Sequence, residues 1–157
     1  MAKQLITQQE YDFIVAELAR LKKRDGVITA DLKHSLNIGS ETWHDNDMYD
    51  TAKDQKQRIT SDKILLERAL KESSVTAVDP DLNTVGIGTT IELEDEAGQK
   101  MTINLGGALG SRLGGQWISS LSPLGQAILG TKTGLNITVD LPAGTKSYTV
   151  VSISPIK

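Results

Sequence analysis

The chain has 157 residues, no cysteine and a formal net charge of −3 at pH 7. The lack of cysteine excludes a disulfide framework, a thiolate metal site and a cysteine nucleophile, and the acidic balance argues against a protein that wraps duplex nucleic acid by charge alone. With 38% hydrophobic but only 4% aromatic residues, the sequence has room for one modest core and one elongated element.

A long amphipathic helix is predicted between Thr7 and Gly39. Thr7 and Glu10 have the spacing of a capping box, Gly39 is a typical helix stop, and Gly26 is expected to cause a local irregularity. Because this helix starts so early and no run of about 18 apolar residues occurs, we expect no signal peptide and no membrane span, and therefore a cytoplasmic protein. The apolar residues are spaced as in a coiled-coil seam: Tyr11, Ile14, Leu18, Leu21, Ile28 and Leu32.

A second helix is predicted from about Asn46 to Ser73, with its own apolar stripe. The stripe consists of Tyr49, Ala52, Ile59, Leu66 and Leu70. Polar residues are expected to lie largely outside it, namely Lys53, Asp54, Lys56, Gln57, Asp62 and Lys63. Each helix has one seam and needs one partner, so we expect an antiparallel hairpin, a stalk of roughly 40 Å at about 1.5 Å per residue.

The segment between the two helices is acidic. It contains the carboxylates Glu41, Asp45 and Asp47 together with Trp43. Acids at the tip of a rigid stalk can carry negative charge to another site. The plainer alternative is a solvated loop whose Asp and Asn side chains satisfy the first N–H groups of the second helix.

The second half of the chain has strand patterns. Asp79-Pro80-Asp81 ends the helical region, and Gly, Thr and β-branched residues follow. Residues 89–94 and 100–105 alternate around one turn, and residues 135–140 and 147–153 alternate around another. The sequence therefore predicts two β-hairpins.

A short helix is predicted between the hairpins, because Ser122 can cap it, Pro123 suits its first position and a glycine follows its end. The predicted class is α+β. Residues 1–78 form an antiparallel coiled-coil hairpin with an acidic tip loop at 39–47, and residues 79–157 form a small antiparallel β domain with one short helix.

The chain resembles the Gre family of transcript-cleavage factors over nearly its whole length. The most specific motif is residues 122–130, Ser-Pro-Leu-Gly-Gln-Ala-Ile-Leu-Gly, which is similar to the family signature Ser-Pro-(Ile/Leu)-(Ala/Gly)-x-Ala-(Ile/Leu)-(Ile/Leu)-Gly. The other similar strings are Glu17-Leu18-x-x-Leu21-Lys22, Asn46-x-x-Tyr49, Arg58-Ile59 and Leu66-Glu67-x-x-Leu70.

This resemblance implies an FKBP-like fold for the C-terminal domain and a monomer without a cofactor of its own. The C-terminal domain is expected to dock on core RNA polymerase, while the coiled coil enters the secondary channel of the polymerase. The residues expected at the docking surface are Ser122, Pro123, Leu124 and Gly125. The factor itself is then no enzyme, because it stimulates the RNA-cleavage activity of the polymerase.

The resemblance also implies roles at the tip. Asp45 and Glu41, with Asp47 as an auxiliary, are expected to assist the Mg²⁺ ion of the polymerase when the 3′ end of backtracked RNA is cleaved. Contacts to the nascent RNA 3′ end or to the polymerase are expected from Trp43, His44, Asn46, Tyr49, Lys33, Lys53 and Arg58.

The tip departs from the family pattern Gly-Asp-Leu-x-Glu-Asn. Residues 39–46 are two residues longer between the Gly and the Asn, Asp45 stands where the family has Glu, and Thr42 stands where it has Asp. Metal positioning tolerates little displacement of carboxylate oxygens. A Gre-like regulator that occupies the channel and inhibits or retunes the polymerase without cleavage is therefore an alternative.

Two other functional classes are alternatives. A peptidyl-prolyl isomerase would need a pocket lined by aromatic side chains, and the C-terminal half has only Trp117 and Tyr148. A structural module that dimerises through the stalk is the other class.

The glycines at 106–115 lack the Gly-Lys-Ser/Thr of a phosphate-binding loop, so we expect no phosphate-binding loop there.

Overall fold

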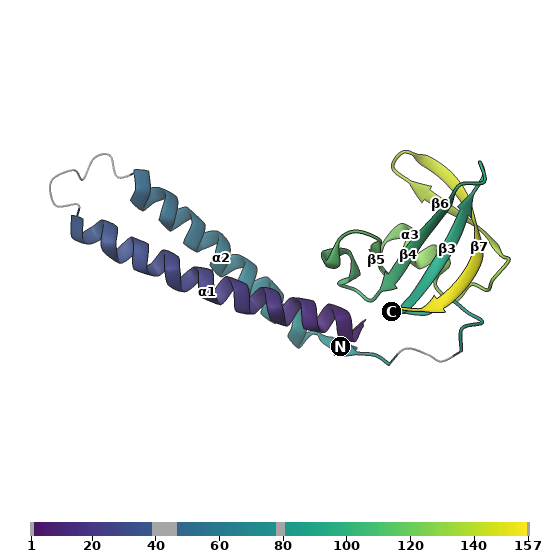
Figure 1. Ribbon diagram of the computed structural model, residues 1–157, viewed down its shortest axis with the longest axis horizontal. Helices are drawn as coiled ribbons and strands as arrows, with labels where there is room; N and C mark the ends of the chain where they lie inside the picture. The colour runs from purple at the N-terminus through teal and green to yellow at the C-terminus, as the bar shows by residue number, and fades with distance from the viewer. Residues whose placement is uncertain (1, 39–46, 78–80, 157) are drawn as a thin grey trace. The chain divides into compact units, whose positions relative to one another are not determined.

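The computed structural model describes residues 2–38, 47–77 and 81–156 (Figure 1). The chain forms two compact units. One comprises Phe13–Glu72, and the other comprises Met1–Asp12 together with Ser73–Lys157. The predicted α+β class, a helical hairpin followed by a small β domain, is confirmed. In the described part of the chain, no helix has a stretch both long and apolar enough to span a bilayer.

The helical unit consists of α1 (Gln8–Ile38) and α2 (Asp47–Lys71), apart from the first turn of α1. The predicted seam is largely confirmed, because Ile14, Leu18, Leu21, Ile28, Ile59 and Leu66 are all buried. Tyr11 was wrongly placed in it: its side chain is 41% exposed and belongs to the other unit. The irregularity expected at Gly26 does not occur, since α1 continues through it and the tertiary packing outweighs the poor helix propensity of one glycine.

The second unit is built around a curled five-stranded sheet in the order β5-β4-β3-β7-β6 (Figure 1). Its strands are β3 (Thr89–Asp95), β4 (Lys100–Gly106), β5 (Trp117–Ser119), β6 (Asn136–Leu141) and β7 (Gly144–Pro155). Both predicted hairpins are confirmed as the antiparallel pairs β3–β4 and β6–β7. A 3₁₀ turn, η1 (Gly110–Leu113), precedes β5.

Helix α3 (Pro123–Ile128) packs against one face of this sheet (Figure 1). The predicted start is confirmed: the Ser122 hydroxyl accepts a hydrogen bond from the Gly125 N–H, and Pro123 occupies the first turn. Alternating strand residues form the core together with Val85 and Ile128. Its members are Val85, Ile91, Leu93, Ile103, Leu105, Ile128, Ile137, Val139, Tyr148 and Val150.

Two parallel strand pairs were not predicted. β5 pairs in parallel with β4, so the sheet is not wholly antiparallel. A separate two-stranded sheet joins β1 (Gln4–Ile6) to β2 (Ser73–Val75). All three unpredicted strands are only three residues long, too short for an alternation of side chains to be recognised.

Glu10, in the first turn of α1, is fully buried and links the start of the chain to the loop that follows β4. The predicted capping box is present: Glu10 Oε2 accepts from the Thr7 N–H at 2.6 Å, and the Thr7 hydroxyl accepts from the Glu10 N–H at 3.2 Å. The same carboxylate also accepts from Gly107 N–H at 2.7 Å and Leu109 N–H at 3.0 Å. These bonds explain why Met1–Asp12 belongs to the C-terminal unit.

The two compact units do not coincide with the domains 1–78 and 79–157 that the sequence predicts. Met1–Asp12 and the residues from Ser73 onward lie with the β domain, because β1 pairs with β2 and the Leu5 carbonyl accepts from the Ala108 N–H at 3.0 Å. The boundary at residue 78 remains a prediction about where the independently folding domain begins.

Replacing Glu10 by alanine is expected to destabilise the protein severely. Glu10→Ala leaves the buried N–H groups of Thr7 and Gly107 and the partly buried N–H of Leu109 without their acceptor, and each buried group left unpaired costs about 1–3 kcal/mol. Urea unfolding followed by circular dichroism should show a loss on the order of 3 kcal/mol or more. The control is the exposed Asp12→Ala, expected within about 0.5 kcal/mol of wild type; equal effects of the two changes would contradict the role of Glu10.

Candidate functional site

Most of the predicted tip residues lie outside the described part of the chain. These are Glu41, Trp43, His44, Asp45 and Asn46. Asp47 is described: it is exposed in the first turn of α2, where a carboxylate interacts favourably with the helix dipole. Tyr49, one turn further, is half-buried. The metal-ligand roles of Asp45 and Glu41 therefore stay predictions.

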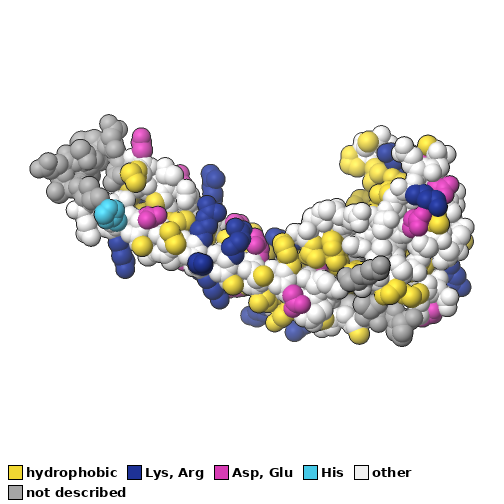
Figure 2. Space-filling model, in the orientation of Figure 1, with side chains coloured by type: hydrophobic (Ala, Val, Ile, Leu, Met, Phe, Trp, Pro, Cys, Tyr) yellow, Lys and Arg dark blue, Asp and Glu magenta, His cyan; other side chains and the backbone are white. Residues whose placement is uncertain are grey.

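The predicted basic contact residues Lys33, Lys53 and Arg58 are all exposed. Among the described residues, none of the three has an ion-pair partner within 4.0 Å. Their charges are therefore available to an anionic partner. Figure 2 shows Lys and Arg side chains projecting from the helical unit.

Lys56 and Lys63 have a different role from Lys33, Lys53 and Arg58. The sequence-based placement of Lys56 and Lys63 outside the apolar stripe was wrong: both side chains are partly buried and reach Asp25 of α1, at 3.0 and 3.5 Å. Lys56 also donates to the Thr29 hydroxyl at 2.7 Å. Lys56, Ile59 and Lys63 follow each other at steps of three and four, so the two lysines occupy seam positions.

The charged layer formed by Asp25, Lys56 and Lys63 affects the titration of its carboxylate. The hydrogen bond from Lys56 is the main cause that lowers the pKa of Asp25, and the nearby positive charges of Lys56 and Lys63 add to it. An opposite charge at this distance favours the ionised carboxylate. The folded helical unit therefore holds Asp25 charged under ordinary conditions.

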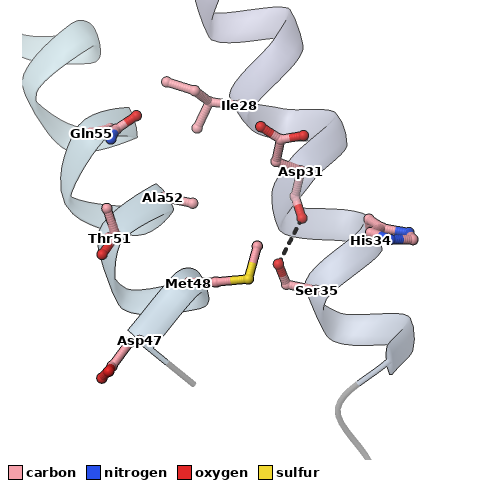
Figure 3. Close-up of a pocket in the computed structure, with 9 residues that line it drawn as sticks. All are labelled: Ile28, Asp31, His34, Ser35, Asp47, Met48, Thr51, Ala52 and Gln55. Carbon is pink, nitrogen blue, oxygen red and sulfur yellow. Dashed lines mark hydrogen bonds between the residues drawn. The ribbon is translucent and has the colours of Figure 1, made fainter. Parts of the chain in front are cut away.

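A groove opens between α1 and α2 beside the described helix ends (Figure 3). Its volume is about 410 Å³. The lining residues are Ile28, Asp31, His34 and Ser35 of α1, and Asp47, Met48, Thr51, Ala52 and Gln55 of α2. Figure 3 shows the Met48 side chain extending from α2 toward α1, and His34 and Asp47 pointing away to the margins.

The groove lies where the described seam residues toward the tip are only partly buried, namely Leu32 and Ser35 on α1 and Tyr49 and Ala52 on α2. Ile28 is the last buried seam residue on α1, and Ile59 is its counterpart on α2 among the described residues. The next positions toward the tip include Ser35 and Ala52, whose side chains are too small to bridge two helices. The groove was not predicted from the sequence, although the small residues Ser35 and Ala52 at seam positions are a signal for it.

The expected docking residues on α3 have unequal exposure. Pro123 is exposed, whereas Leu124 packs partly against the core and Ser122 caps the helix. Gly125 is buried, and a Cβ there would lie 2.1 Å from the Ser119 carbonyl oxygen. The missing side chain of Gly125 therefore allows close packing within the chain.

The described residues contain no group of three or more His, Asp or Glu side chains that could hold a metal ion. Of the aromatic residues weighed for an isomerase pocket, Tyr148 belongs to the core and Trp117 is half-buried on β5. The described features with binding potential thus include the groove, the exposed basic residues on the helices and the exposed part of α3.

Fold and site define a protein with a helical hairpin attached to a small β domain. Residues 79–155 match the family model "Transcription elongation factor, GreA/GreB, C-term". A transcription elongation factor GreA from Syntrophomonas wolfei is 31% identical over 154 residues, which cover 95% of this chain and 94% of the relative. The transcription inhibitor protein Gfh1 of Thermus aquaticus is 30% identical, with 98% of each chain covered.

The chain belongs to the GreA/GreB family of transcription elongation factors. Among solved structures, the crystal structure of Thermus aquaticus Gfh1 covers 98% of this chain and 99% of its own length, at 28% identity and a TM-score of 0.44.

The charged layer predicts a pH-dependent stability. Because the pKa of Asp25 is lowered in the folded state, its contribution is present above the pKa of an unfolded Asp, about 3.9, and is lost as the pH falls through the folded value. Asp25→Asn should therefore melt at a lower temperature than wild type at pH 7, and the difference should shrink below about pH 4.

The measurement is thermal unfolding followed by circular dichroism from pH 7 to pH 2. Asp62→Asn, an exposed position on α2, serves as the control and should change the melting temperature little. A difference between wild type and Asp25→Asn that stays constant over this range would rule out the assigned ion pairs.

Proposed function

We propose that this chain is a transcription factor that binds core RNA polymerase and acts through the secondary channel of the polymerase. The observation that carries the proposal is the likeness to GreA and Gfh1 proteins over nearly the full length of the chain. The two-helix architecture of residues 13–72 supports it, because a hairpin with a narrow apolar seam and polar outer faces suits a narrow aqueous channel.

In this proposal the β domain provides the docking surface and the helical hairpin provides the working end. The exposed Pro123, with the neighbouring Leu121 at 56% exposure, offers an apolar contact on the domain. The exposed charges of Lys33, Lys53 and Arg58 are suited to the phosphates of the nascent RNA 3′ segment. The factor acts as a monomer, and analytical ultracentrifugation tests that part of the proposal.

The proposed action at the tip is stimulation of RNA cleavage by the polymerase. Asp45 and Glu41 would share the Mg²⁺ ion of the polymerase active site, with Asp47 as an auxiliary. Carboxylate oxygens are the ligands that Mg²⁺ prefers, and a second metal ion supports phosphodiester hydrolysis. In this proposal the chain has no cofactor of its own. Its side chains help to hold the Mg²⁺ ion, and the polymerase performs the chemistry.

A second candidate is a channel-binding regulator that inhibits or retunes the polymerase without cleavage. Two observations favour it. A relative with 30% identity over 98% of this chain is named a transcription inhibitor, and the tip from Gly39 to Asn46 is two residues longer than the family pattern. The two candidates share docking and channel entry and differ only in the outcome at the tip.

Docking is tested by Pro123→Glu in the full-length chain. Glu is well tolerated at the first position of a helix because it complements the helix dipole, so the fold should persist. Affinity for core RNA polymerase should fall about tenfold, because a charge is introduced at the apolar contact. The matched control is Pro155→Glu at the exposed end of β7. Equal affinities of the two variants would exclude Pro123 from the docking surface.

The tip is tested by Asp45→Asn, which keeps the shape of the side chain and removes its charge. Binding to the polymerase should stay nearly unchanged, whereas Mg²⁺-dependent cleavage of RNA in a backtracked complex should fall about a hundredfold, on the order of 3 kcal/mol of transition-state stabilisation.

Two outcomes separate the candidates. A wild-type chain that slows elongation and never cleaves at any Mg²⁺ concentration supports the inhibitor. A variant Asp45→Asn that cleaves as well as wild type removes Asp45 from the proposed role, and Glu41→Gln then tests the other carboxylate.

A further inference from the structure

The groove between α1 and α2 includes the most exposed large hydrophobic residue in the described part of the chain. Met48 is 77% exposed, the highest value among the exposed large hydrophobic residues. Met48 lines the groove, and its side chain extends from α2 toward α1 (Figure 3). Exposed apolar side chains beside a groove are typical of an interaction site, and Met adapts its shape to a partner.

The charges around the groove select the kind of partner. The lining includes two carboxylates, Asp31 and Asp47, and no Lys or Arg. Within the described residues, neither carboxylate has a cation within 4.0 Å. By contrast, Asp25, further down the same stalk, is neutralised by Lys56 and Lys63. The groove is therefore a negatively charged site with an apolar floor.

We propose that this groove docks a polypeptide segment of the RNA polymerase channel that presents one apolar side chain next to an Arg or Lys. The apolar side chain would contact Ile28, Met48 and Ala52, and the cation would reach Asp31 at the rim. This inference rests on the proposed function, because it deepens the channel-binding step. It assigns a second contact with the polymerase, in addition to the one on α3.

The size and polarity of the groove agree with such an occupant. About 410 Å³ falls in the lower part of the range of roughly 300–1,000 Å³ typical of pockets that hold a compact group. A nucleic acid segment is disfavoured inside the groove, because its phosphates would meet two carboxylates and the lining holds no Lys or Arg, only His34 as a basic residue. A charge-assisted pair with Asp31 would instead add specificity and speed association.

The first experiment locates the occupant by photocrosslinking. The full-length chain carries p-benzoylphenylalanine at Thr51, on the groove, or at Gln57, an exposed residue outside the groove lining on the same helix. Each chain is irradiated in complex with core RNA polymerase, and crosslinked peptides are identified by mass spectrometry. The inference expects Thr51 to crosslink to a polymerase peptide with an apolar residue within two positions of an Arg or Lys, and Gln57 not to reach that peptide.

The second experiment measures affinity for core polymerase. Asp31→Lys reverses the rim charge and Ala52→Trp fills the groove; each should weaken binding about tenfold. Asp54→Lys, an exposed position outside the groove lining on α2, should stay within about twofold of wild type. Circular dichroism checks that Ala52→Trp folds, and Asp31→Lys tests the site without adding bulk between the helices.

The outcomes are distinguishable. If wild type binds the polymerase and both groove variants bind equally well, the docking inference is wrong while the proposed function stands. Crosslinks from Thr51 only to nucleic acid, or only to residues 39–46 of the same chain, also overturn it. If wild type does not bind the polymerase, the proposed function itself fails, and the docking inference fails with it.

Discussion

The β-containing unit depends on one buried carboxylate. Glu10 is a charge placed entirely out of water, which is costly unless hydrogen bonds replace the lost hydration. Three backbone N–H groups do so, two of them almost a hundred residues away along the chain. One side chain thereby caps α1 and fixes the loop that follows β4.

The backbone around Glu10 is close-packed to make this arrangement possible. A Cβ at Gly107 would lie 1.9 Å from the Leu5 carbonyl oxygen, so only glycine fits there. The Leu5 carbonyl in turn accepts from the Ala108 N–H. The start of the chain is therefore a structural part of the C-terminal unit, even though it also begins the first long helix.

Local signals were enough to predict most of the fold. The Thr7–Glu10 spacing, the two hairpins and the cap of α3 each depend on residues close in sequence, and each is confirmed. The features that were not predicted depend on residues far apart in the sequence. No local pattern predicts that the Glu10 carboxylate also accepts hydrogen bonds from Gly107 and Leu109. The same holds for the parallel pairing of two strands of three residues.

The candidate site was less predictable than the fold. Lys56 and Lys63 were assigned to the solvated face because charged residues usually lie there, and only the position of Asp25 explains why they occupy the seam. The groove was not predicted because it depends on the small size of two seam side chains, Ser35 and Ala52. Lys33, Lys53 and Arg58 are exposed. Their predicted contacts with the nascent RNA or the polymerase stay predictions.

The charged layer in the middle of the helical unit also has a consequence for dynamics. Polar groups at a seam specify register but stabilise less than apolar packing. On one side of the layer lie the buried Ile14, Leu18 and Leu66, and on the other side the described seam residues beyond Ile28 are only partly buried. Backbone amides near Met48 and Leu36 should therefore exchange hydrogen through small local openings, whereas those near Leu18 exchange only when the whole helix pair separates.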